Sequence, residues 1–289
     1  MDILPQILTN GIIAGALYGL IALGFNFIYG TVKFFDLAYG SVLVMSGYGV
    51  FLFTKTLGLS LVVGLPLSIL ICALFGLGVY RTVYTHLQKK RASNMAYIVA
   101  SLGVFTVVQA IIAISFTSQF QTIATGAQTV FRLGSVVITQ IQLLAVLFFI
   151  LISVLLALFL GYTRMGKAAR AVADDASVSE IIGINTKKIT SWVFVIGSVI
   201  GAIAGIITAY DTGIEPTMGF ALVLKGVIAA IIGGVGNIWG GVLGALGLGL
   251  IENLGVWQFS AEWKDVIAYT VLIIVLVFRP QGIFKKKSS

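Results

Sequence analysis

Two charged residues, Lys225 and Glu252, interrupt stretches of sequence that are otherwise apolar. A charged side chain near the centre of a bilayer costs about 2.5–3.5 kcal/mol on membrane-insertion scales, so it usually marks a transport pathway or a binding partner. Glu252 lies close to the predicted end of its stretch, and Lys225 is long enough to extend its ammonium group to the membrane surface. We take Glu252 as a candidate for a substrate pathway, although both positions also suit the membrane surface.

A second candidate region follows the first apolar stretch. The run 37–53 is short for a membrane span and rich in glycine, which predicts a broken or re-entrant helix. Irregular backbone at membrane depth is tolerated only where protein covers it or where it faces a water-filled cavity. We therefore expect Asp36, Tyr39 and Gly40 to line a pathway, while an ordinary helix preceded by a loop explains the same pattern.

The chain has no recognisable set of catalytic or metal-binding residues. It contains no Walker A loop, no HExxH zinc helix and no GxSxG nucleophile turn. Cys72 and His86 are the single cysteine and histidine, whereas a zinc site needs three or four ligands. We expect no enzymatic activity, no cofactor and no metal site. An ion-coupled carrier typically buries several charged groups, so their scarcity indicates that the driving energy comes from another protein.

The longest polar segment, residues 162–190, mixes basic and acidic side chains between two apolar stretches. Its central part, 165–183, predicts a short helix or helix pair with an apolar stripe. A helix lying on the membrane would show such a stripe, but the mixed charges favour docking of a soluble protein. We expect Arg164, Lys187 and Lys188 to hold the ends of the segment at the membrane surface. The residues expected to form the docking segment are Gly166, Arg170, Ala171, Asp174, Asp175 and Gly183.

The overall composition indicates a membrane protein. Of 289 residues, 59% are hydrophobic and 10% are charged, and the mean hydropathy is +1.08, whereas soluble domains carry about 25% charged residues. Several apolar runs reach the roughly 20 residues that an α-helix needs to cross a bilayer. We predict an all-α polytopic membrane protein with a single domain over residues 1–289, in which residues 162–190 form a cytoplasmic loop.

The distribution of Lys and Arg predicts the sidedness of the chain, because cytoplasmic loops are enriched in these residues. Three segments are clearly basic: 81–91, 162–190 and the tail from Arg279. Even numbers of apolar runs separate them, so all three lie on one side of the membrane. This predicts eight to nine transmembrane or re-entrant helices with the N-terminus outside and the C-terminus in the cytoplasm. The net charge of +8 then belongs to loops at a lipid bilayer, and we expect no nucleic-acid partner.

Glycines recur at four-residue spacing in three apolar stretches. Small residues spaced in this way line one face of a helix and let a second helix approach closely. We expect these positions to serve helix packing, with a direct role in the substrate path as the alternative for the first of the three stretches. The positions are Gly11, Gly15, Gly19, Gly197, Gly201, Gly205, Gly236, Gly240 and Gly244. The glycine cluster at 233–236 also predicts an interrupted helix or a tight hairpin.

Four stretches, taken together and in order, carry a family resemblance. They are the opening run 10–24, the segment 164–185 with its RMGK start and GIN end, the glycine-rich run 233–252 and the ending RPQGIF at 279–284. On these residues the chain resembles, over nearly its whole length, the LivH-type inner-membrane permease subunits of ATP-binding-cassette (ABC) importers for branched-chain amino acids. The family usually has Asn-Phe-Ala-His-Gly where this chain has DLAYG at 36–40, and commonly proline at Trp239, which leaves the substrate open.

The resemblance implies a transport subunit of the cytoplasmic (inner) membrane of a prokaryote. This chain and a second permease subunit, either a sister chain or another copy of itself, would form the pathway. ATP-binding subunits would bind segment 162–190, and a periplasmic or lipid-anchored binding protein would deliver branched-chain or related amino acids. The alternatives are a permease of the same superfamily for urea, amides or other amino acids, and a self-contained secondary carrier driven through Glu252 or Asp36.

Overall fold

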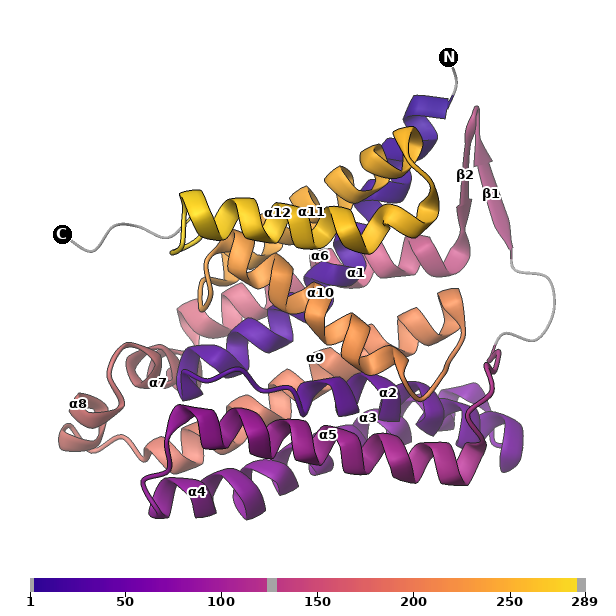
Figure 1. The fold of residues 1–289 in the computed structure, drawn as a ribbon. Helices are drawn as coiled ribbons and strands as arrows, with labels where there is room; N and C mark the ends of the chain where they lie inside the picture. The colour runs from indigo at the N-terminus through magenta and orange to yellow at the C-terminus, as the bar shows by residue number, and fades with distance from the viewer. Residues whose placement is uncertain (1–2, 124–128, 285–289) are drawn as a thin grey trace.

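The computed structural model describes residues 3–123 and 129–284. Long apolar helices make up most of it, and α1 runs diagonally through the molecule between helices such as α5 and α12 that run across it (Figure 1). Six of the helical segments are long and apolar enough to cross a membrane. They are α1 (Ile3–Val32), α3 (Leu61–Val79) continued through a π-helical turn (Tyr80–Tyr84) into α4 (Thr85–Lys89), α5 (Asn94–Phe116), α6 (Gln140–Tyr162), α9 (Thr186–Thr212) and α11 (Ile238–Gln258).

Three shorter apolar helices complete the bundle. They are α2 (Tyr39–Phe51), which continues as a π-helical turn (Leu52–Thr56), α10 (Met218–Gly233) and α12 (Lys264–Phe278). The predicted helical, polytopic character of the chain is confirmed at this level, since apolar helices of membrane-spanning length dominate the structure.

One β-hairpin is an element that the prediction of an all-α chain omits. Strands β1 (Val130–Leu133) and β2 (Val136–Thr139) pair in antiparallel fashion. The Gln6 side chain attaches the hairpin to α1, because it accepts from the Val137 N–H at 2.7 Å and donates to the Val137 carbonyl at 3.1 Å. Part of the polar segment before the hairpin, residues 124–128, lies outside the described residues.

Helix α1 is the central helix of the bundle. It packs against α6, α9, α10 and α11, and most of its middle and second half is buried. Glycines allow the close approach to α11: a Cβ atom on Gly11 would lie 2.9 Å from Leu250 Cδ2, and one on Gly15 would lie 2.8 Å from the Leu246 Cα. Gly249 of α11 in turn packs on the backbone of both α1 glycines. The two helices therefore meet through small residues on both sides.

The other predicted glycine positions fall into different surroundings. On α9, Gly197 faces Ile28, Gly201 faces Tyr39, and Gly205 faces the backbone of Leu43. In the remaining set, Gly19 faces Phe149, Gly240 faces Gly233, and Gly244 faces Ala229. Gly236 instead lies in the turn between α10 and α11 with φ +84°, outside either helix, so its role is to allow the turn.

The two ends of the bundle differ in what they carry. Helices α4, α7 (Arg164–Asp174) and α8 (Ala176–Ile181) gather at one end together with the end of α12, at the left of Figure 1. The beginning of α1 and the β-hairpin lie toward the opposite end. The predicted basic segments 81–91 and 162–190 therefore share one end of the molecule. Residues 285–289 of the basic tail lie outside the described residues.

Candidate functional site

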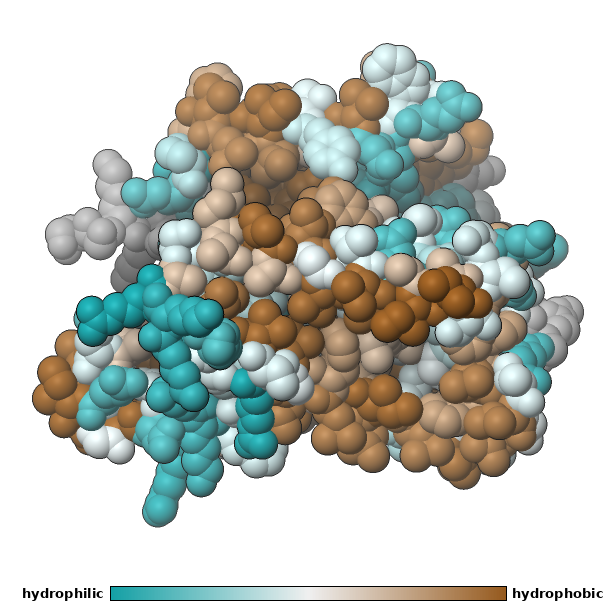
Figure 2. Space-filling view, turned by 60° about the horizontal axis from the view of Figure 1, so that its bottom comes forward, coloured by the Kyte–Doolittle hydropathy of each residue, from teal (hydrophilic) through white to brown (hydrophobic). Residues whose placement is uncertain are grey.

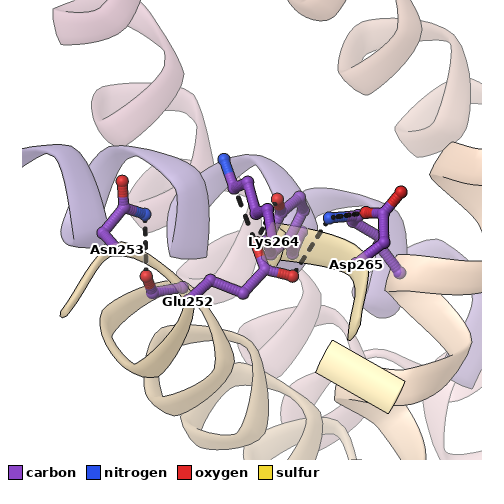
Figure 3. A network of polar contacts seen from close by, with 7 residues as sticks. Glu252, Asn253, Lys264 and Asp265 are labelled. Atoms are coloured by element: carbon purple, nitrogen blue, oxygen red, sulfur yellow. Dashed lines mark hydrogen bonds and ion pairs between the residues drawn. The ribbon is translucent and has the colours of Figure 1, made fainter. Parts of the chain in front are cut away.

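A fully buried carboxylate, that of Glu252 on α11, lies at the centre of a charged network (Figure 3). The Tyr18 hydroxyl of α1 donates to Glu252 Oε2 at 2.7 Å. The Lys225 ammonium of α10 lies 3.1 Å from Glu252 Oε1 and 2.8 Å from Asp265 Oδ1, while Lys264 Nζ lies 3.9 Å from Glu252 Oε2. Two ammonium groups thus neutralise two carboxylates, which is the condition under which buried charge is tolerated.

The network joins α1 to three consecutive helices near the other end of the chain, α10, α11 and α12. Tyr18 and Glu252 are separated by 234 residues, and Lys225 and Glu252 by 27. The Lys225 ammonium also lies 5.3 Å from the centre of the Tyr18 ring, where the negative face of the ring attracts a cation. The sequence singled out Lys225 and Glu252 as separate residues, and it gave no signal that they pair. Tyr18 belongs to the opening run that carries the family resemblance, but nothing local marked it as a partner of Glu252 or distinguished it from other aromatic residues in an apolar helix.

A cavity of about 350 Å³ lies beside this network. Cavities of roughly 300–1,000 Å³ that combine apolar walls with a few polar groups are typical of small-molecule sites. Its wall has apolar residues from α1 and α10 and polar or charged residues from α1, α6, α9, α10, α11 and the start of α12. The residues relevant to its chemistry are Ile13, Leu17 and Leu222 on the apolar side and Tyr18, Thr208, Asp211, Lys225, Asn253 and Lys264 on the polar side.

Asp36 lies elsewhere, in the connection between α1 and α2, where it is buried. Its carboxylate accepts a hydrogen bond from the Tyr84 hydroxyl at 2.5 Å and from the Ala38 N–H at 3.0 Å. Among residues 3–123 and 129–284, no Lys or Arg forms an ion pair with it. This carboxylate therefore orders the start of α2 through hydrogen bonds to neutral donors.

Tyr39 and Gly40 are packed inside the bundle near Asp36. Tyr39 touches Gly24 and Gly201, while Gly40 lies against the Gly219 carbonyl and Phe105. A space of about 10 Å³ lies next to Asp36 and Tyr39, room for about one water molecule. These predicted pathway residues are thus covered by helices, and none of them lines the cavity beside Glu252.

The predicted docking segment folds as the helix pair α7–α8, and a side chain caps the N-terminus of each helix. Gly166 packs directly on the backbone of Phe159 and Leu160, and its N–H donates to Thr163 Oγ1 at 2.9 Å, which fixes the angle between α6 and α7. The Asp175 carboxylate accepts from the N–H groups of Ser177 and Val178 and begins α8.

Most of the other residues predicted for docking are exposed. Gly183 (φ +89°) follows α8 in a conformation that favours glycine. Arg170 and Asp174 are exposed on α7, and Ala171 is partly buried. Two further residues of the predicted apolar stripe, Ile181 and Ile182, are 84% and 68% exposed.

Comparison with known proteins assigns the chain to a family. The family described as "Branched-chain amino acid transport system / permease component" matches residues 7–276. The chain belongs to this family. The permease is 32% identical to the high-affinity branched-chain amino acid transport system permease protein BraD of Pseudomonas aeruginosa, with 96% of this chain and 94% of that protein covered. It is 30% identical to LivH of Escherichia coli K12, with the same coverage of each chain. The predicted family membership is confirmed.

A solved structure also has a similar fold. It is PsaBC from Streptococcus pneumoniae in complex with Fab, with a TM-score of 0.56 and 12% identity. The match covers 96% of the permease and 93% of that chain, so the likeness extends over the whole arrangement of helices. The permease is therefore a multi-pass membrane component of an ABC transport system, consistent with its apolar helices.

Proposed function

We propose that this permease carries branched-chain or closely related amino acids through the cytoplasmic membrane of a prokaryote, in an importer whose ATP is hydrolysed on partner subunits. The observation that carries the proposal is the similarity to BraD and LivH over 96% of the chain. A second permease subunit would complete the pathway, and a binding protein outside the membrane would deliver the substrate.

The proposed contact with an ATP-binding subunit is the outward surface of α7 and α8. Ile181 and Ile182 are apolar side chains exposed on a segment outside the apolar spans, and such exposed groups commonly mark protein contacts. Movement of this surface would reach α6 through the packed Gly166 junction. It would reach α9 through Asn185, whose side chain accepts from the Lys188 N–H at 3.0 Å.

The proposed orientation places α4, α7 and α8 in the cytoplasm and the beginning of α1 outside. It rests on the gathering of the basic segments at one end of the bundle, since cytoplasmic loops are enriched in Lys and Arg. Counting α2, α10 and α12 with the longer helical segments gives nine membrane segments in this proposal. The cavity beside Glu252 then opens in the outer half of the bundle.

That cavity is the proposed point of contact with the transported amino acid. Lys225 and Lys264 offer ammonium groups for the α-carboxylate, and Asp211 offers a carboxylate for the α-ammonium group. Ile13, Leu17 and Leu222 offer an apolar wall for an aliphatic side chain. Asp36, Tyr39 and Gly40 would act on transport only through the packing of α2.

Reconstitution in proteoliposomes tests the function. The permease, a sister permease, the ATP-binding subunits and the binding protein should together take up radiolabelled leucine only with ATP inside. Uptake of urea or amides in place of leucine would show that the substrate belongs to another class. ATP-independent uptake by the permease alone would establish a secondary carrier, and the buried Glu252–Lys225 pair would then be the candidate for ion coupling.

Charged substitutions test the proposed docking surface. Ile181→Asp with Ile182→Asp should release the ATP-binding subunits and abolish uptake, and Ala171→Arg with Gly183→Arg should do the same. Met95→Asp is the matched control, because Met95 is also apolar and 67% exposed but lies on α5. Undiminished co-purification of the ATP-binding subunits with the isoleucine variant would refute this surface.

A further inference from the structure

A second cavity lies at the basic end of the permease, between the α3–α4 continuation and the start of α9. Its volume is about 490 Å³. Figure 2, which turns the lower side of Figure 1 forward, shows hydrophilic side chains gathered at one end of this side and apolar side chains over much of the rest. The cavity is lined by Leu77, Tyr80, Arg81, Thr85, Lys187, Lys188, Ser191, Trp192 and Val195.

Both walls change from basic to apolar in the same direction. Along α9 the order is Lys187 and Lys188, then Trp192, then Val195, which spans about 12 Å at 1.5 Å per residue. The opposite wall runs from Arg81 near the start of α4 back to Leu77 inside α3. A ligand that fits this cavity has an anionic group at one end and an apolar part that extends toward the membrane interior.

The basic side chains are available to a ligand. The ion pairs among residues 3–123 and 129–284 involve Lys225 and Lys264, and none of them includes Arg81, Lys187 or Lys188. Glu180 of α8, an acid on the adjoining segment, accepts a hydrogen bond from Thr186 instead. Three cations around one cavity without an acidic partner repel one another, and an anion between them would relieve that repulsion.

Aromatic residues give the cavity a defined wall. The Tyr80 and Phe194 rings stack with their centres 4.9 Å apart, so the two sides of the cavity are fixed to each other. Trp192 is exposed, and tryptophan is enriched where the hydrocarbon region meets the headgroups. Both features suit a bound lipid better than a free anion, which would need no apolar wall.

We propose that this cavity binds an anionic phospholipid of the cytoplasmic leaflet. Its phosphate would lie between Arg81, Lys187 and Lys188, and an acyl chain would follow Leu77, Trp192 and Val195. Basic pockets between membrane helices on the cytoplasmic side are suited to anionic headgroups. The assignment to the cytoplasmic leaflet rests on the proposed orientation. The assignment of an anionic phospholipid rests only on the basic side chains and the apolar wall of the cavity.

Lipid titration of the purified, detergent-solubilised permease tests the proposal without transport or partner subunits. Native mass spectrometry should show at least tenfold tighter binding of phosphatidylglycerol than of phosphatidylcholine with the same acyl chains. The combined variant Arg81→Gln, Lys187→Gln and Lys188→Gln should lose that preference by at least tenfold. Inorganic phosphate at millimolar concentration should not displace the lipid.

A charge-matched control separates a specific site from general attraction. Lys89→Gln, Lys90→Gln and Arg91→Gln remove the same charge from the same end of the molecule but lie outside the cavity. This control should bind phosphatidylglycerol within twofold of the unmodified permease. Equal losses in both triple variants, equal binding of the two lipids by the unmodified permease, or displacement by phosphate would each overturn the proposal. The lipid comparison on the unmodified chain decides the question even if a variant fails to fold.

Discussion

Replacement of Lys225 by Met tests whether the Glu252 carboxylate depends on this ammonium group. The substitution keeps the length of the side chain and removes contacts at 3.1 Å to Glu252 and 2.8 Å to Asp265. Breaking a buried pair by removing one partner typically costs 3–5 kcal/mol. The Tyr18 hydroxyl and the more distant Lys264 stay with Glu252, so we expect about 3 kcal/mol, at the lower end of that range.

The complementary change, Glu252→Gln, should be milder. Glutamine keeps the shape and can still accept from Tyr18, and Lys225 is 15% exposed and keeps Asp265 as a partner. We expect a loss of about 1–2 kcal/mol, the cost of a weakened buried hydrogen bond. The double variant should cost little more than Glu252→Gln alone, because no buried charge is then left unpaired; Asp265 and Lys264, which lose a partner, are 66% and 36% exposed. The two single losses and the double loss would give a coupling energy of about 2–3 kcal/mol.

Equilibrium unfolding in mixed detergent micelles, followed by circular dichroism, measures these free energies. Lys264→Met serves as the control, since this ammonium is more exposed and lies 3.9 Å from Glu252, and it should cost less than about 1 kcal/mol. If the losses from Lys225→Met and Glu252→Gln add to within about 0.5 kcal/mol in the double variant, the two groups are independent. The reasoning from the buried pair would then be wrong.

Three further predictions concern packing, hydrogen bonding and capping. Gly249→Val should unfold the permease or greatly lower its folded yield in size-exclusion chromatography, because its side chain would meet the α1 backbone, whereas Gly247→Val on the same helix has open space and should leave the yield unchanged. Tyr84→Phe removes the hydroxyl donor to Asp36 and should lower the unfolding free energy by about 1–3 kcal/mol; no change in the unfolding midpoint would show that another donor replaces it. Asp175→Ala removes the cap of α8 and should speed amide hydrogen exchange in that helix, and unaltered exchange there would contradict the capping role.

The features that local sequence predicts well are those with a local cause. The apolar stretches predicted the long helices, because the thickness of the hydrocarbon core of a bilayer sets the length of a spanning helix. The mixed charges of residues 162–190 gave the helix pair α7–α8, and the glycine cluster gave the turn after Gly233. The prediction that Gly236 lies on a helix face was wrong. Gly236 lies in the turn after α10, and its four-residue spacing to Gly240 spans the boundary between this turn and α11.

The candidate site depends on contacts between distant parts of the chain, which the sequence did not reveal. The sequence shows that Glu252 is a charged residue whose burial in an apolar stretch costs free energy, but its partner Tyr18 lies 234 residues away. Asp36 could equally be recognised as a buried charge, yet only the structure shows that Tyr84 donates a hydrogen bond to it and that it does not line the cavity beside Glu252. A hydropathy pattern reports how polar a residue is, whereas the identity of its neighbour follows from the arrangement of helices.

The central position of α1 has a consequence for how the permease is made. Its small-residue face packs on α11, yet roughly 200 residues separate the two helices, and synthesis at 5–20 residues per second takes about 10–40 s to cover them. During that interval α1 must wait in the bilayer without its main partner. Any factor that shields the bare glycine face of α1 would protect the nascent chain, and a pause before Ile238 would lengthen the exposure.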